Sequence, residues 1–343
     1  MPFIKSAFKG FSILLFSIFI IMSTVNKGNS VSINLPSINR AFSYDKLKYY
    51  DLCYPKMLEV FTNHNIKMSD EWKQIDLDKN NSGDFFTNKD TGFEATAFTR
   101  QKTIAIVIRG MHLSNFTFDS FWRDKDGTSA RSIFFGNMGV PLLGKVPAQF
   151  NDAIAFYKIV KKNFPDYKIV LVGKSLGGSL AELLGAIYGD DTYTFASPGM
   201  YYAVPKLPKD LQERIAQNSQ TRFTYIKTYY NINDPCGGYG RHIGLSFVYP
   251  PIKNYKNFFS DVHGNIKNFA SEDAISKIRA IPPEWADRHA AALIYYDSKF
   301  VEKPGIFSLH KFIKIRYRVE EKDFFEAEKI VNKLFDLNDD KSS

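Results

Sequence analysis

Apolar residues recur along the chain in two kinds of run, and their spacing predicts its secondary structure. Short runs that are apolar at nearly every position are typical of strands buried on both faces of a sheet. Longer stretches with apolar residues three and four positions apart are typical of helices with one buried face. These runs predict strands at 103–109, 167–172, 191–196 and 222–229 and helices at 41–62, 148–163 and 176–188.

Strands that alternate with helices predict an α/β fold with a mostly parallel central sheet. The turn Asp90–Thr91–Gly92 separates two strand-like runs and predicts a hairpin ahead of the parallel strands. An irregular stretch rich in Phe, Gly and Ser occupies residues 111–146. Near the C-terminus, residues 310–320 alternate like a strand and residues 321–337 have helical spacing, which predicts a small extension beside the core.

The first 30 residues have the order of a signal peptide. Two lysines precede an apolar stretch at 11–22, which is shorter than the ~20 residues of a transmembrane helix, and small residues follow at 28–30. We therefore expect a secreted or periplasmic protein, with an uncleaved membrane anchor as the alternative. In an oxidising compartment Cys53 and Cys236 could pair, or they could be two buried thiols.

Composition and charge narrow the class of protein. The chain has 343 residues, 44% of them hydrophobic and 24% charged, which fits one large or two ordinary globular domains. The net charge of +9 is scattered, and no nucleic-acid-binding motif is visible. It indicates general solubility or a weak preference for anionic membrane surfaces. No group of His, Cys and Asp has the spacing of metal ligands, so we expect neither a metal nor a cofactor.

The strand 167–172 runs directly into the sequence GKSLGG, residues 173–178, at the start of a predicted helix. A serine between glycines at such a junction is typical of a G-x-S-x-G nucleophile elbow. Glycine permits the sharp turn, which displays Ser175 at the carboxyl edge of the sheet, where α/β proteins bind ligands. The N–H of Leu176, at the start of the helix, can donate to an oxyanion. The alternative is a flexible glycine-rich turn in which the serine has no role.

Motifs on both sides of the elbow extend this pattern. Upstream, the strand that ends in Arg109–Gly110 is followed by Trp122 and Asp124, and downstream lie TFASPGM at 194–200 and NDP at 233–235. Together with GKSLGGSLA, these motifs resemble those of the class 3 lipases, a branch of the α/β-hydrolases whose elbow usually reads G-H-S-L-G-G-A-L-A.

The resemblance covers about residues 45–300 and implies an α/β-hydrolase fold with a nucleophile elbow and serine-hydrolase chemistry. The chain departs from the family pattern at two positions. Lys174 stands where the family usually has His, and Gly199 stands where it usually has Arg. The second departure indicates a distant bacterial-type member.

A serine nucleophile needs a histidine that takes its proton and a carboxylate that orients the histidine. In α/β-hydrolases the chain order is Ser, then Asp or Glu, then His. Asp234 lies near the carboxyl end of the predicted strand 222–229, and its NDP motif resembles the family position of the acid. We therefore predict Ser175 as nucleophile and Asp234 as acid. The alternative is that Asp234 only forms a turn before Pro235.

The choice of base is less constrained, because four histidines follow the elbow: His242, His263, His289 and His310. The family's catalytic histidine precedes a Tyr near the head of a late helix, and this resemblance selects His289, six residues ahead of Tyr295. His263, in the polar loop SDVHGN, is the first alternative. His242, in GRHIG, resembles a structural position of the family, and His310 lies beyond the matched region.

The resemblance also implies that the residue after R-G donates its backbone N–H to the oxyanion. This residue is Met111, so Met111 and Leu176 are the predicted oxyanion-hole donors. Family members often have Ser or Thr there, whose hydroxyl adds a hydrogen bond that Met cannot make. We therefore expect slower turnover rather than an inactive protein.

The predicted organisation is a signal peptide (1–30), a lipase-like α/β-hydrolase domain (31–301) and a C-terminal extension (302–343). The expected function is hydrolysis of carboxylic esters of lipids, as in a lipase, phospholipase A or lysophospholipase. The expected partners are therefore a lipid or other ester substrate and the lipid surface that holds it. The alternatives are a thioesterase or peptidase on the same fold, and a non-catalytic binding protein. Residues 111–146 lie where family lids lie, or they form an ordinary surface loop.

Overall fold

The computed structural model describes residues 48–61, 68, 71–75, 77, 85–110, 146–221, 223–231, 234, 237–238, 241–249, 263 and 266–281. Several predictions fall outside these residues: the leader 1–30, nearly all of the stretch 111–146, the C-terminal extension 302–343 and the segment around His289. Within the described part of the chain, no helix combines the length and the apolar character that crossing a membrane requires.

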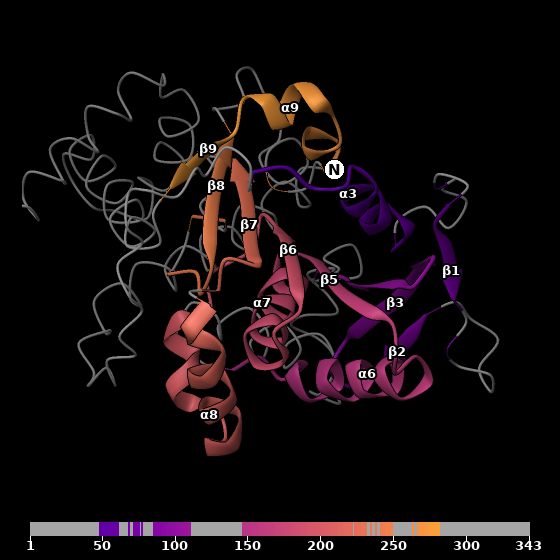
Figure 1. Cartoon of the computed structure of the whole chain (residues 1–343), viewed down its shortest axis with the longest axis vertical. Helices are drawn as coiled ribbons and strands as arrows, with labels where there is room; N and C mark the ends of the chain where they lie inside the picture. The colour runs from indigo at the N-terminus through magenta and orange to yellow at the C-terminus, as the bar shows by residue number, and fades with distance from the viewer. Residues whose placement is uncertain are drawn as a thin grey trace, which may run out of the picture.

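The described strands form one mixed sheet (Figure 1). Its spatial order is β1-β3-β4-β5-β6-β7-β8-β9, and β2 also pairs with β3. Strands β4 to β8 are parallel, whereas β1, β2, β3 and β9 pair antiparallel at the two sides. In chain order the strands are β1 (Lys73–Ile75), β2 (Phe86–Asn88), β3 (Phe93–Arg100), β4 (Thr103–Ile108), β5 (Lys168–Lys174), β6 (Asp191–Phe195), β7 (Ile226–Asn231), β8 (Leu245–Tyr249) and β9 (Arg279–Ile281).

Helices cover both faces of this sheet. One face and the loops beside it carry the helices α6 (Phe150–Asn163), α7 (Leu176–Tyr188), η2 (Tyr201–Lys206), α8 (Lys209–Asn218) and η3 (Ser219–Thr221). The other face carries α3 (Cys53–Met57), η1 (Leu58–Phe61), η5 (Ile266–Phe269) and α9 (Glu272–Ser276). In Figure 1, α6, α7 and α8 lie together, and α3 and α9 lie on the opposite side of the strands.

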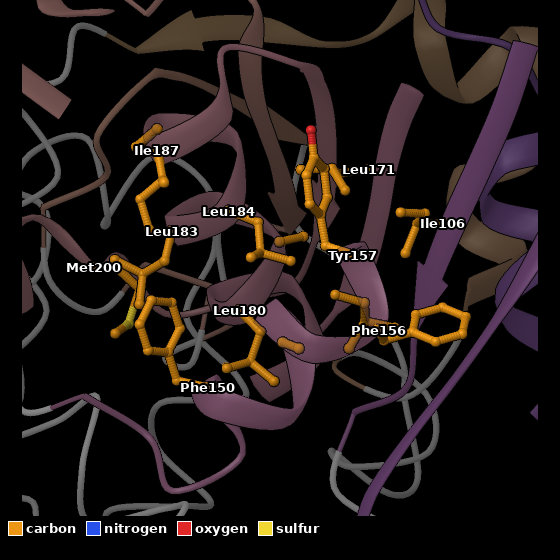
Figure 2. Close-up of a cluster of buried hydrophobic side chains, with 14 of the residues drawn as sticks. Ile106, Phe150, Phe156, Tyr157, Leu171, Leu180, Leu183, Leu184, Ile187 and Met200 are labelled. Carbon is orange, nitrogen blue, oxygen red and sulfur yellow. The ribbon is translucent and has the colours of Figure 1, made fainter. Parts of the chain in front are cut away.

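The central strands are buried on both faces, which explains their nearly continuous apolar runs. In β4, Ile104 and Ile106 pack toward the α6–α7 side, whereas Ala105 and Val107 pack toward α3 and η1. Successive side chains of a strand point to opposite faces, so one run supplies two cores. Figure 2 shows the first core, to which Ile106 contributes together with side chains of α6 and α7.

The structure confirms the predicted α/β fold and most of the predicted elements. Asp90–Gly92 lies in the turn of an antiparallel pair, β2 and β3, in which Asn88 faces Phe93. The strand predicted at 222–229 begins later, at Ile226. Of the helix predicted at 41–62, the described residues contain only the short α3 and η1.

Candidate active site

Ser175 occupies a strained turn between β5 and α7. β5 ends at Lys174 and α7 begins at Leu176, so Ser175 alone makes the junction. Its φ of 52° and ψ of −127° lie in a region that residues with a β-carbon rarely adopt. The surrounding structure holds it there, because its N–H donates to the Phe195 carbonyl at 3.0 Å and its own carbonyl accepts the N–H of Gly178 at 3.0 Å.

The glycines beside Ser175 are required by close packing of the backbone. A β-carbon on Gly173 would lie 2.3 Å from the carbonyl oxygen of Gly177, and one on Gly177 would lie 2.3 Å from the carbonyl oxygen of Ile108. A β-carbon on Gly178 would lie 2.5 Å from the β-carbon of Ser197. The G-x-S-x-G-G sequence therefore allows α7 to start directly against β4 and β5.

Ser175, His263 and Asp234 form a hydrogen-bonded series. The Nε2 of His263 is 3.1 Å from the Oγ of Ser175, and its Nδ1 is 2.9 Å and 3.2 Å from the two carboxylate oxygens of Asp234. A carboxylate only accepts, so Nδ1 carries the proton and Nε2 is left to accept the serine hydroxyl proton. The Asp234 side chain is fully buried, whereas that of His263 is 12% exposed.

The parallel sheet explains why these three residues meet. Ser175 follows β5, Asp234 follows β7, and His263 follows β8, and the carboxyl ends of parallel strands lie at one edge. Asp234 is also fixed through its backbone. Its N–H donates to the Asn231 carbonyl at 2.8 Å, and its carbonyl accepts the N–H of Gly238 at 2.9 Å.

This geometry corrects the prediction that His289 is the base. The place between Ser175 and Asp234 is occupied by His263, the first alternative, while His289 lies outside the described residues. The prediction failed because it did not include the strand β8 (Leu245–Tyr249), which precedes His263. The apolar run LSFVY is the signal that could have revealed it. His263 then lies in the segment that follows the last parallel strand.

His242, the other alternative, uses both ring nitrogens in hydrogen bonds with Glu182 and Gly237. Its Nδ1 is 2.8 Å from a carboxylate oxygen of Glu182, and its Nε2 is 3.0 Å from the carbonyl oxygen of Gly237. The side chains of His242 and Glu182 are fully buried. This environment agrees with the structural role that the GRHIG motif suggested. The partner residue, Glu182, was not singled out from the sequence.

The predicted oxyanion donors are described only in part. Leu176 is the first residue of α7, where N–H groups have no partner within the helix and the helix dipole favours negative charge. Met111 lies outside the described residues, so its role stays a prediction. Gly110, just before it, lies against the elbow, because a β-carbon there would be 2.8 Å from the Lys174 carbonyl oxygen and 3.1 Å from the Ser175 β-carbon.

Two other predictions concern metals and cysteines. Across the part of the chain that the structure describes, no group of three or more His, Cys, Asp or Glu residues could hold a metal ion. Cys236 lies outside the described residues, so its pairing with Cys53 stays a prediction.

No protein-family model matches the chain. Segments of it are similar to fungal proteins named "Putative lipase ATG15". The protein from Candida glabrata is 50% identical over 46 residues, which are 13% of this chain and 9% of that protein. The one from Eremothecium gossypii is 41% identical over 58 residues, 17% of this chain and 11% of that protein. The one from Mycosarcoma maydis is 32% identical over 108 residues, 26% of this chain and 21% of that protein.

These matches span about a tenth to a fifth of the length of the curated relatives. The relatives are fungal, so the predicted assignment to a bacterial-type branch finds no support among them.

Among solved structures, the triacylglycerol lipase from Penicillium expansum is 16% identical with a TM-score of 0.34, over 57% of this chain and 77% of that chain. Lipase II from Rhizopus niveus is 17% identical with a TM-score of 0.34, over 66% of this chain and 90% of that chain. The architecture is that of the α/β-hydrolase fold. It has a mostly parallel sheet with helices on both faces, a strained serine between β5 and α7, and an acid and a histidine after later strands.

Proposed function

We propose that this protein is a serine hydrolase that cleaves carboxylic esters of lipids. The observation that supports the proposal most is the hydrogen-bonded series from Ser175 through His263 to the buried carboxylate of Asp234. A hydroxyl, an imidazole and a carboxylate in this order can generate a nucleophile at neutral pH.

In the first half of the reaction, His263 Nε2 accepts the hydroxyl proton of Ser175 while Oγ attacks the ester carbonyl. The imidazolium that forms lies 2.9 Å from the Asp234 carboxylate, which stabilises its charge and fixes its orientation. Negative charge develops on the carbonyl oxygen, and the N–H of Leu176 at the start of α7 can donate to it. Met111 is proposed as the second donor.

The intermediate then collapses. The bond between the carbonyl carbon and the alcohol oxygen breaks, His263 gives its proton to that oxygen, and the acyl group stays on Ser175. In the second half, a water molecule gives a proton to His263 and attacks the acyl carbon. The bond between that carbon and Ser175 Oγ then breaks, and His263 returns the proton to Oγ. The products are a free alcohol, a carboxylic acid and the regenerated serine.

Two observations support a lipid as the substrate class. The named relatives are called lipases, although they match only over short segments. The motifs on both sides of the elbow resemble those of the class 3 lipases. The proposal covers three kinds of lipid ester, those of triacylglycerols, phospholipids and lysophospholipids.

A fluorophosphonate probe tests the chemistry directly, because it modifies only an activated serine. Wild-type protein is expected to be labelled on Ser175, and Ser175→Ala protein is expected to remain unlabelled. Hydrolysis of triacylglycerols, diacyl phospholipids, lysophospholipids and a short p-nitrophenyl ester then identifies the substrate. A folded wild-type protein that neither reacts with the probe nor cleaves any of these esters would favour a binding protein on this fold.

A further inference from the structure

A buried Glu–His pair lies between the elbow helix α7 and the turn that carries Asp234. The Nδ1 of His242 is 2.8 Å from Oε2 of Glu182, and both side chains are fully buried. The other carboxylate oxygen of Glu182 accepts the N–H of Met200 at 3.1 Å and that of Ile243 at 2.7 Å. The proposed chemistry makes no direct use of this pair.

Both ring nitrogens of His242 have a hydrogen-bond partner. A backbone carbonyl only accepts, so Nε2 must donate to the Gly237 oxygen 3.0 Å away. Glu182 accepts two backbone N–H groups at one oxygen, as a carboxylate does, and faces Nδ1 with the other. One proton lies between Nδ1 of His242 and Oε2 of Glu182, so the two side chains are joined by a buried hydrogen bond whichever of the two atoms carries it.

Gly237 connects the Glu182–His242 pair to the candidate acid, Asp234. The carbonyl of Gly237 accepts from His242, and a β-carbon on Gly237 would lie 3.3 Å from Oδ2 of Asp234. The next residue, Gly238, donates its N–H to the Asp234 carbonyl at 2.9 Å. Tyr230 packs against both His242 and Gly237. Its ring stacks on the His242 ring with 5.8 Å between the ring centroids, and its β-carbon would lie 2.3 Å from a β-carbon added to Gly237.

Glu182 lies on the helix that directly follows the nucleophile. Ser175 precedes the first residue of α7 and Glu182 follows seven residues later, which is about two turns or ~10 Å along the axis. The helix α7 is therefore connected to the Asp234 turn at a second point, independent of the Ser175–His263 contact.

We propose that Glu182 and His242 are positioning residues, which hold the Asp234 turn against α7 and so set the geometry of the acid relative to the nucleophile. The inference rests on the proposed function, because Asp234 must act on Ser175 through His263 for its position to matter. In this arrangement the pair contributes to kcat without touching the ester, and it leaves the binding of a small substrate nearly unchanged.

Glu182→Gln is the conservative variant. The Gln carbonyl oxygen can accept the N–H groups of Met200 and Ile243, and its amide can donate to Nδ1 of a neutral His242 that still donates to Gly237. The connection between α7 and Gly237 is kept, so kcat is expected to remain within about 3-fold of wild type.

Glu182→Met removes the connection at similar volume. The Asp234 turn is then expected to shift, and a misplacement of ~1 Å can cost about 100-fold, so kcat on p-nitrophenyl butyrate is expected to fall about 10- to 100-fold with little change in KM. If Glu182→Met does not fold, the double variant Glu182→Gln/His242→Phe replaces it. This variant carries no charge at positions 182 and 242, keeps an aromatic ring against Tyr230 and loses both hydrogen bonds of His242, to residue 182 and to Gly237.

Tyr157→Phe is the matched structural control. The Tyr157 hydroxyl donates to Asp190 at 2.6 Å, beyond the far end of α7, so its loss weakens the same layer without contacting the Asp234 turn. Its melting temperature is expected to fall and its kcat to stay at the wild-type value. In an Asp234→Asn background, Glu182→Met is expected to lower kcat no further, because the residue through which it acts is already inactive.

The outcomes separate the two proposals. Wild-type protein without Ser175-dependent hydrolysis would overturn the proposed function and this inference together. Active wild-type protein in which Glu182→Met lowers kcat no more than Tyr157→Phe would overturn the inference alone. An equal loss of kcat in Glu182→Gln and Glu182→Met, or full additivity with Asp234→Asn, would do the same.

Discussion

Gly177 packs so closely against Ile108 that a β-carbon on the glycine would lie 2.3 Å from the isoleucine carbonyl oxygen. This contact joins the first turn of α7 to the end of β4. The chain continues from there through Arg109 and Gly110 to the predicted oxyanion donor Met111. The same backbone contact therefore fixes the elbow relative to the end of β4, from which the chain continues toward Met111.

Gly177→Ala is expected to lower both stability and activity. The clash is with backbone atoms, which cannot rotate away, so the loss should be about 1–3 kcal/mol of unfolding free energy, measured by urea denaturation. Gly189→Ala is the matched control at the other end of α7, where φ is +80° but the nearest atom to a β-carbon is 3.6 Å away. It should lose stability through backbone strain and keep its activity. Equal activity in both variants would contradict the proposed role of the contact.

Ser175→Ala is expected to lower the rate of ester hydrolysis by several orders of magnitude while the fold stays intact. Ser175→Gly should also be inactive. Because glycine adopts a φ of 52° without strain, it should unfold at a higher temperature than the alanine variant. Calorimetry of the two variants and activity on a short ester test both statements. A melting temperature of the glycine variant below that of the alanine variant would show that the turn is not strained.

His263→Ala is expected to match Ser175→Ala in activity, and the double variant should be little worse than either, because these residues act as a unit. His289→Ala, the position favoured by the sequence, should retain most of the activity. The rate of fluorophosphonate labelling provides a second measurement on the same variants. Loss of labelling in His289→Ala with normal labelling in His263→Ala would reverse this assignment.

Asp190→Asn is expected to stabilise the protein at neutral pH. Burial raises the pKa of Asp190 above its ordinary value of 3.8, and the hydrogen bond from Tyr157 offsets this only in part. The folded state therefore binds the proton more tightly than the unfolded state, and stability falls as the pH rises above 3.8 through the folded-state pKa. Asparagine still accepts from Tyr157 without carrying charge. Its advantage in thermal unfolding should be constant above the folded-state pKa of Asp190 and should shrink as the pH falls from there toward 3.8. A difference that stays constant down to pH 3.8 would contradict the prediction.

Export is expected to remove the leader, so that the mature chain begins near Val31. Mass spectrometry of protein recovered outside the cytoplasm tests this point. A cytoplasmic product that keeps Met1 would contradict it, without consequence for the chemistry of Ser175.

Local patterns predicted the sheet well because each central strand is buried on both faces. The runs 103–109 and 167–172 correspond to β4 and β5, and the amphipathic stretch 148–163 corresponds to α6. The positions of Ser175 and Asp234 followed from strand ends, since the ends of parallel strands converge whatever the details of their loops.

The histidine could not be chosen in this way, because chain order alone admits every histidine after Asp234. The decision depended on β8, a five-residue strand whose run LSFVY lies between irregular segments. The pair of Glu182 and His242 was hidden for another reason. A glutamate in an apolar helix has no local signal for its partner, and this partner is 60 residues away in the chain.

Every residue of α7 from Leu176 to Ile187 is buried, so the helix behind the nucleophile has no face in contact with solvent. A helix enclosed on all sides has little freedom to vary over evolutionary time, because almost any substitution changes the packing of its neighbours. Diversification of such a protein toward new substrates would therefore be concentrated in the connections that follow the parallel strands, while α7 would be inherited nearly unchanged.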